Sequence, residues 1–158
     1  MRAFAIVLRC GLTVAVAAVL PQLAFAQVSA GAAVKWGPGP DFIPPGAQFA
    51  VLQGDPGEAG GYTIRLRLPD RYQFPSHFHP NDEHVTVLSG TFLVGMGDTL
   101  DLTHTQQLSA GGFITAAANA HHFAAARGET ILQVSGEGPF AITYVKASDD
   151  PRTAKPKP

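Results

Sequence analysis

From residue 47 onward, short apolar runs alternate with residues that favour turns. Segments such as Gly54-Asp55-Pro56-Gly57 and Ser89-Gly90 can reverse the chain through positive φ angles or a fixed proline. Runs of this length and spacing predict strands, and many short strands joined by turns predict an all-β sandwich, jelly roll or small barrel. The predicted strands span residues 48–52, 63–68, 85–88, 91–94, 113–115, 131–134 and 141–145.

Sustained helical periodicity is not found in the sequence. The alanine-rich run 116–126 has helix propensity, but two histidines and flanking glycines interrupt it. We therefore expect no substantial helix after the N-terminal segment.

Residues 1–26 have the features of a secretory signal peptide. Arg2 and Arg9 make the start positive, residues 11–20 are apolar, and Ala24-Phe25-Ala26 is a small-residue cleavage pattern. A retained membrane anchor is the alternative, but the apolar run is shorter than the about 20 residues that span a bilayer. We expect cleavage after residue 26, export to the periplasm or the cell exterior, and no membrane contact afterwards.

Charge and cysteine content narrow the possible functions. Cleavage would leave 9 basic against 12 acidic residues, a formal net charge of −3. The basic residues are scattered, whereas nucleic-acid binders cluster them to neutralise phosphates, so we expect no nucleic-acid partner. Cys10 is the only cysteine and lies in the leader, which excludes disulfides and thiolate metal sites from the mature chain.

The mature chain is long enough for one single-core domain. Residues 27–46 are rich in Gly, Pro and Ala and predict an irregular N-terminal arm. Residues 47–147 hold the predicted strands and form the barrel. Residues 148–158 combine charge and proline with little apolar surface, which predicts a disordered tail.

His77, His79 and Glu83 form the most informative cluster. Residues two apart on a strand share a face, so both histidines project together and Phe78 points away. A turn at residues 80–82 would bring Glu83 beside them. Two imidazoles and a carboxylate on a concave face suit a borderline divalent cation, and without a cation an inward carboxylate would be costly. The alternative is a chance cluster of surface polar residues.

Two spacings resemble the motifs of the cupin family. His77-x-His79-x3-Glu83-x6-Gly90 is similar to the first motif. Residues 111–122 keep the spacing of the second motif, with Ala117 at its proline position and Asn119 at its second glycine. The resemblance implies a cupin jelly-roll barrel (a double-stranded β-helix), a fourth metal ligand at His122, and a homodimer.

Several polar residues have roles that the sequence leaves open. Strand alternation sends His121 and His122 to opposite faces, and the motif spacing favours His122 as the ligand. His121 and His84 are then expected at the barrel rim or an oligomer contact, whereas His104 lies in a predicted loop. Phe78 should serve sheet packing or a dimer interface. Gln133 and Tyr144 lie in predicted strands and could line the cavity. Arg65 and Arg67 share one face of their strand, which is either solvated or binds an anion.

The resemblance is compatible with Fe, Mn, Zn, Ni, Cu or Co, and with several chemistries. Four protein ligands on an octahedral metal leave two positions open, as reactive sites require. The leading hypothesis is a metal-dependent enzyme acting on a small molecule, dioxygenase-type rather than isomerase-type because no general base stands out beyond the ligand set. The alternative is a non-catalytic module that binds or senses a metal or small ligand. An ionisable side chain near the open positions would favour the enzyme, and an apolar closed cavity would favour the module.

Overall fold

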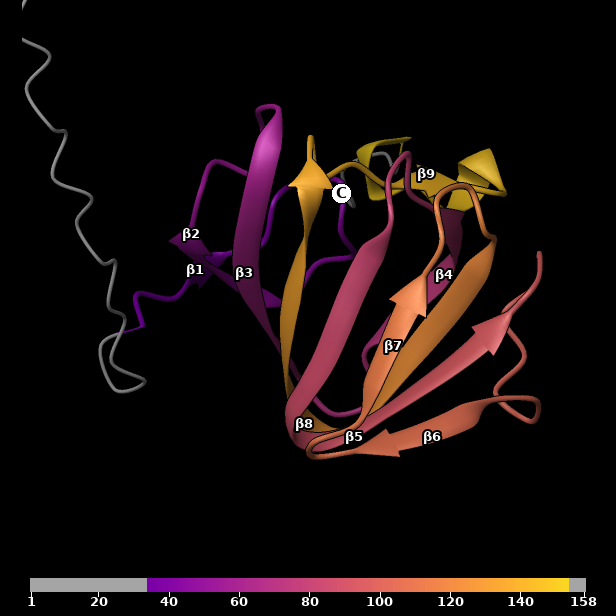
Figure 1. Ribbon diagram of the computed structural model, residues 1–158. Helices are drawn as coiled ribbons and strands as arrows, with labels where there is room; N and C mark the ends of the chain where they lie inside the picture. Colours follow the sequence, from indigo (N-terminus) through magenta and orange to yellow (C-terminus); the bar gives the residue numbers. More distant parts are fainter. Residues whose placement is uncertain (1–33, 154–158) are drawn as a thin grey trace, which may run out of the picture.

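The computed structural model describes residues 34–153, which form a curled antiparallel sheet followed by two 3-10 helices (Figure 1). The predicted signal peptide lies outside the described residues. No helix in residues 34–153 has the length and apolar character needed to cross a membrane. The elements are β1 (Gly37–Pro38), β2 (Gln48–Gln53), β3 (Gly60–Leu68), β4 (Gln73–Phe78), β5 (Glu83–Met96), β6 (Gln106–Ser109), β7 (Phe113–Ala116), β8 (His122–Gly138), β9 (Thr143–Tyr144), η2 (Ala147–Asp149) and η3 (Pro151–Thr153).

Strands β5 and β8 are long and bend together at the bottom of the view in Figure 1, so each runs through both halves of the barrel. The sequence predicted two separate strands around Ser89-Gly90. That prediction was wrong in detail, because Gly90 has φ 81° and the register shifts there without ending the strand. A Cβ at Gly90 would collide with the backbone oxygen of Glu129, so the bend requires glycine.

The bends divide the sheet into two facing halves. In one, β3 and β7 flank the paired segments of β8 and β5 that run from the bend to Gly138 and Glu83. In the other, β4 and β6 flank the segments around His122 and Met96, and β9 pairs with the far edge of β4. The predicted all-β jelly roll is confirmed.

Alternation along the strands builds the core between the halves. On β3, Ile64, Leu66 and Leu68 point inward and are buried, while Arg65 and Arg67 lie on the opposite face as predicted. Arg65 donates to the Gln133 side chain at 3.3 Å, and Arg67 packs over the Trp36 ring at 4.4 Å. Gln133 therefore lies on the outer face and does not line the cavity.

Both ends of the described chain pack on the barrel. Within the predicted irregular arm, β1 pairs with β2, and Ile43 is buried in the core. Residues 148–153 belong to the predicted disordered tail, yet the structure gives them parts of η2 and η3. These residues bury no hydrophobic side chain, and local polar contacts hold them, which explains why their composition predicted disorder.

Candidate metal centre

Four polar side chains meet inside the barrel, near one of its ends. His77 lies on β4 opposite His122, the first residue of β8. Glu83 begins β5, and His79 follows the last residue of β4. Each histidine is 4% exposed and Glu83 is 9% exposed. The β4 to β5 connection and the start of β8 thus bring together the four residues whose sequence spacing suggested a metal site.

Their potential ligand atoms are close enough to share one ion. One ring nitrogen from each of His77, His79 and His122 lies within 4.8 Å of the other two. The Glu83 Oε2 atom lies 3.4 Å from His79 Nε2 and 3.9 Å from His122 Nε2. This is the convergence that the ligand hypothesis requires.

The second ring nitrogen of each buried histidine contacts a backbone carbonyl. A carbonyl can only accept, so in all three rings Nδ1 carries a hydrogen, and in the neutral form of each ring the lone pair is then on Nε2. Metal-ligating histidines are held in this way in known sites. The contacts are His77 to Pro75 O at 2.7 Å, His79 to Ala141 O at 2.8 Å and His122 to Ala120 O at 2.9 Å.

Burial and mutual proximity set the charges of the cluster. Burial, with His122 and His79 nearby, lowers the pKa of His77 to about 3, and burial also lowers the pKa of His122. Burial opposes ionisation of Glu83, but His79 and the other imidazoles outweigh it and hold the Glu83 pKa at about 2. Burial likewise opposes protonation of His79, but Glu83 outweighs it and raises the His79 pKa. The metal-free site therefore holds an ionised carboxylate, two neutral imidazoles and one imidazole stabilised in its protonated form.

The donor set fits a divalent transition metal. The His79 Nε2 atom is buried and has no hydrogen-bond partner among the described residues, and its contact with Glu83 Oε2 is an ion pair at 3.4 Å. Buried polar atoms are normally hydrogen-bonded. Three imidazoles and a carboxylate suit Fe, Mn, Co, Ni, Cu or Zn, and a bound cation would satisfy the unpaired nitrogen.

A tight turn just before β8 is hydrogen-bonded to the connection between β4 and β5. The backbone N–H of Asn119 donates to His79 O at 2.8 Å, and the N–H of Ala118 donates to the Asp82 carboxylate at 2.8 Å. Asn119 has φ 61°, in the left-handed region that asparagine tolerates better than most residues. This position corresponds to the glycine of the second motif, so asparagine replaces glycine there without loss of the turn.

Residues 139–145 form a strap beside the site whose role sequence reasoning missed. The Phe140 ring stacks on His79 with centroids 5.7 Å apart, and Ala141 supplies the carbonyl that holds the His79 ring. Phe140, Ile142 and Tyr144 are all buried. Their period-two alternation was the available signal, but it predicted only a strand and not its contact with His79.

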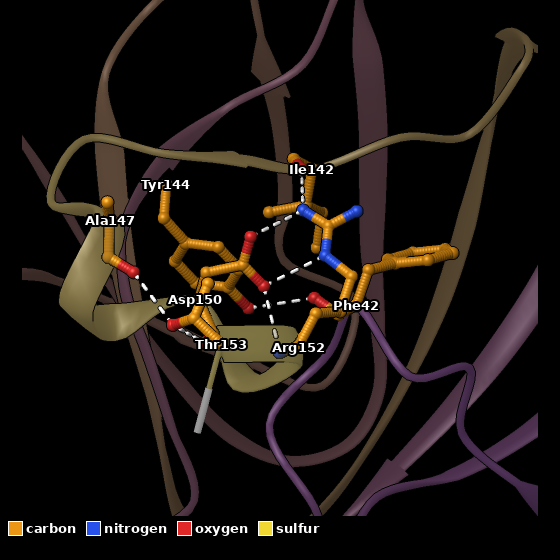
Figure 2. A network of polar contacts seen from close by, with 7 residues as sticks. All are labelled: Phe42, Ile142, Tyr144, Ala147, Asp150, Arg152 and Thr153. Carbon is orange, nitrogen blue, oxygen red and sulfur yellow. Dashed lines mark hydrogen bonds and ion pairs between the residues drawn. The ribbon is translucent and has the colours of Figure 1, made fainter. Parts of the chain in front are cut away.

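The strap is held from outside by the network in Figure 2. The Tyr144 hydroxyl donates to Phe42 O at 2.9 Å, so Tyr144 ties the strap to the N-terminal arm and is not among the residues that line the cavity. Arg152 on η3 contacts Ile142 O at 3.4 Å and the Asp150 carboxylate at 2.7 Å. The C-terminal 3-10 helices therefore pack against the segment that orients His79.

A small cavity adjoins the four polar side chains. About 30 Å³ is open to the centre of a water-sized molecule, which is room for one or two waters. Among the described residues, the four polar side chains are the only ionisable ones that line it. The remaining lining residues are apolar: Leu66, Phe74, Val85, Phe92, Val94, Ile114, Ala116, Ala124, Leu132, Val134, Phe140 and Ile142.

The other three histidines do not join the cluster. His121 contacts the Asp98 carboxylate at 2.7 Å and stacks on Phe78, with centroids 4.9 Å apart. His84 contacts Thr115 Oγ1 at 3.0 Å, and His104 contacts the Asp101 carboxylate at 2.7 Å. The structure therefore places His122, and not its neighbour, beside His77, and it gives Phe78 an outward packing role against His121.

Comparison with known proteins identifies the fold family. The family model described as the ChrR cupin-like domain matches residues 26–141. No functionally curated protein matches the chain.

Several solved structures share the fold. A proposed acetylacetone dioxygenase from Methylibium petroleiphilum is 22% identical with a TM-score of 0.63, covering 84% of this chain and 90% of that one. The polyketide cyclase RemF from Streptomyces resistomycificus is 18% identical with a TM-score of 0.61, covering 80% and 90%. A chain in the complex of Rhodobacter sphaeroides SigE with the anti-sigma ChrR is 19% identical with a TM-score of 0.50, covering 68% and 50%. Structural similarity at identities this low supports the barrel fold and does not indicate the reaction.

Proposed function

Since the chain belongs to the ChrR cupin-like domain family, we propose that it holds a divalent transition metal through His77, His79, Glu83 and His122 and acts there on a small molecule. The observation that carries the proposal is the shared arrangement of the three buried histidines. Each has Nδ1 against a backbone carbonyl, so each has its Nε2 atom available to a cation that the Glu83 carboxylate would share. A bound metal would supply Lewis acidity or redox chemistry at the polar end of the cavity.

The choice of reaction class rests on the ionisable side chains that line the cavity. Isomerases need a side chain that moves a proton next to the substrate. Among the described residues that line the cavity, only the four proposed ligands are ionisable. We therefore favour oxidative chemistry of the dioxygenase type over isomerisation. The leader-like residues 1–26 support a further proposal, that the protein works in the periplasm or outside the cell.

A second candidate is a non-catalytic module that binds or senses a metal or small ligand. The observation that favours it is the same cavity, which is small, apolar and without a second ionisable group. Turnover separates the two candidates. Oxygen uptake that requires both the metal and a small organic molecule would establish the enzyme, whereas tight ligand binding without turnover would establish the module.

Elemental analysis tests the metal site itself. The chain beginning at residue 27 should be purified without an affinity tag, alongside His77→Ala and a control, His84→Ala. His84 lies on the outer side of the same site and contacts Thr115. We expect about one metal ion per chain in the parent and the control, and almost none in His77→Ala. Equal metal content in all three proteins would refute the ligand assignment.

A further inference from the structure

The cavity wall has one polar end, and the rest of it is apolar. Every side chain with a polar atom among the described lining residues belongs to the proposed metal ligands. No hydroxyl, amide, ammonium or guanidinium group of that set faces the remaining space. The opposite wall is built from residues such as Leu66, Phe92, Ile114, Leu132 and Val134.

We propose that this site selects a small ligand with a single coordinating end and an uncharged, apolar body. The proposal rests on the proposed function, because the metal would hold the coordinating end. A hydroxyl on the ligand body would lose its water and find no side-chain partner in the wall, which weakens binding by about tenfold or more. A second carboxylate that faced the wall and could not reach the metal would be rejected more strongly, because a buried unpaired charge costs more than a hydroxyl.

The size of the cavity limits the ligand further. About 30 Å³ is open to the centre of a water-sized molecule, compared with about 150 Å³ for an engineered apolar cavity that holds benzene. This space is smaller than a ring needs, so the ligand body should be a short chain. Sugars and polyols are excluded by polarity, and ring compounds are excluded by size.

Isosteric ligands test this selectivity on protein loaded with cobalt(II), whose visible spectrum reports changes in its ligands. Butanoate and 3-hydroxypropanoate have the same number of non-hydrogen atoms and differ by a terminal methyl or hydroxyl. Azide checks that the metal has an open position. We expect butanoate to bind at least about tenfold more tightly than 3-hydroxypropanoate. Equal or tighter binding of 3-hydroxypropanoate would overturn the proposal.

A pair of matched variants links the selectivity to the wall. Val134 and Val87 are both 1% exposed, but only Val134 lines the cavity. Val134→Thr places a hydroxyl in the wall and should bring the affinities of butanoate and 3-hydroxypropanoate to within about threefold of each other. Val87→Thr makes the same change elsewhere in the core and should leave their ratio unchanged. An unchanged ratio in Val134→Thr would contradict the proposal.

Xenon separates this proposal from the metal assignment. Xenon enters apolar cavities without any coordinating group, so its NMR shift should show saturable binding to metal-free protein, and Val134→Thr should weaken that binding more than Val87→Thr does. Saturable xenon binding in a protein that takes up no cobalt would refute the metal centre while supporting the apolar site. Absence of xenon binding would refute the apolar site even if cobalt binds.

Discussion

The six histidines of the chain fall into two groups of three. His77, His79 and His122 are buried, and each places Nδ1 against a backbone carbonyl. The other three lie outside the cavity, and their Nδ1 atoms contact side-chain oxygens of threonine or aspartate. The same residue type therefore has two environments in one small barrel.

The difference shows how the barrel orients the inner rings. A backbone carbonyl is fixed by the sheet and can only accept, so it fixes both the tautomer and the direction of the ring. The partners of the outer rings are side chains, which the sheet does not fix in this way. Burial favours the neutral form of the inner rings. The hydrogen bonds at Nδ1 add a fixed orientation, which leaves the Nε2 atom of each ring on the side away from the carbonyl.

The adjacent residues His121 and His122 offer the most direct test of the difference between the inner and the outer histidines. We expect His122→Ala to lower metal affinity more than about a hundredfold, beyond the 10–100-fold typical of losing an outer-shell partner. His121→Ala should change it by less than about threefold, because that ring contacts Asp98 and Phe78 on the outer side. Competition against a chromophoric chelator measures both values, and comparable losses in the two variants would contradict the assignment.

Acid should destabilise the metal-free protein through the inner histidines. The pKa of His77 falls from its ordinary value of 6.5 to about 3 on folding, and that of His122 is also lowered. Below about pH 6.5 the unfolded chain therefore binds more protons than the folded one, so the free energy of unfolding decreases as the pH falls. Each group contributes up to about 1.4 kcal/mol per pH unit.

Urea unfolding of the metal-free protein between pH 6 and pH 5 measures this slope. His79, whose pKa is raised on folding, opposes the slope near and above pH 6.5, but below about pH 6 it is protonated in both states and contributes little. Replacing His77 with leucine removes one of the two groups and should reduce the slope by about half. The same slope in His77→Leu and the parent would show that the ring is not buried as a neutral imidazole.

Much of the inner group was predictable from sequence, because strand alternation and fixed turns act over a few residues. The spacing of His77, His79 and Glu83 placed them together. Alternation sent His121 and His122 to opposite faces, and the spacing of the second motif selected His122. The strap was not predictable in its role, since the hydrogen bond from His79 to Ala141 O joins residues 62 positions apart. Gln133 illustrates the same limit, because only the register of β8 against β3 shows that it contacts Arg65 on the outside.

Asn119 offers a way to disturb an inner histidine without changing its ring. Its φ of 61° suits asparagine or glycine, and its N–H holds His79 O. Asn119→Val should lower the free energy of unfolding by about 1–2 kcal/mol, because a β-branched residue is strained there. Asn119→Gly keeps both the conformation and the N–H and should stay within about 1 kcal/mol of the parent. Equal stability of the two variants in urea would argue against the left-handed turn.

The smallest effect should come from Arg152, which acts on the inner group only through the strap. Arg152→Ala removes the contact with Ile142 O, next to the carbonyl that holds His79, so metal affinity should fall by no more than about tenfold. Amide exchange at Phe140 and Val145 should accelerate, because both donate hydrogen bonds that fix the strap to the barrel. Arg71→Ala is a matched control, since Arg71 also pairs with a neighbouring aspartate but lies away from the strap. If Arg71→Ala accelerated exchange at the strap as much as Arg152→Ala, the effect would be a general loss of stability rather than release of this segment.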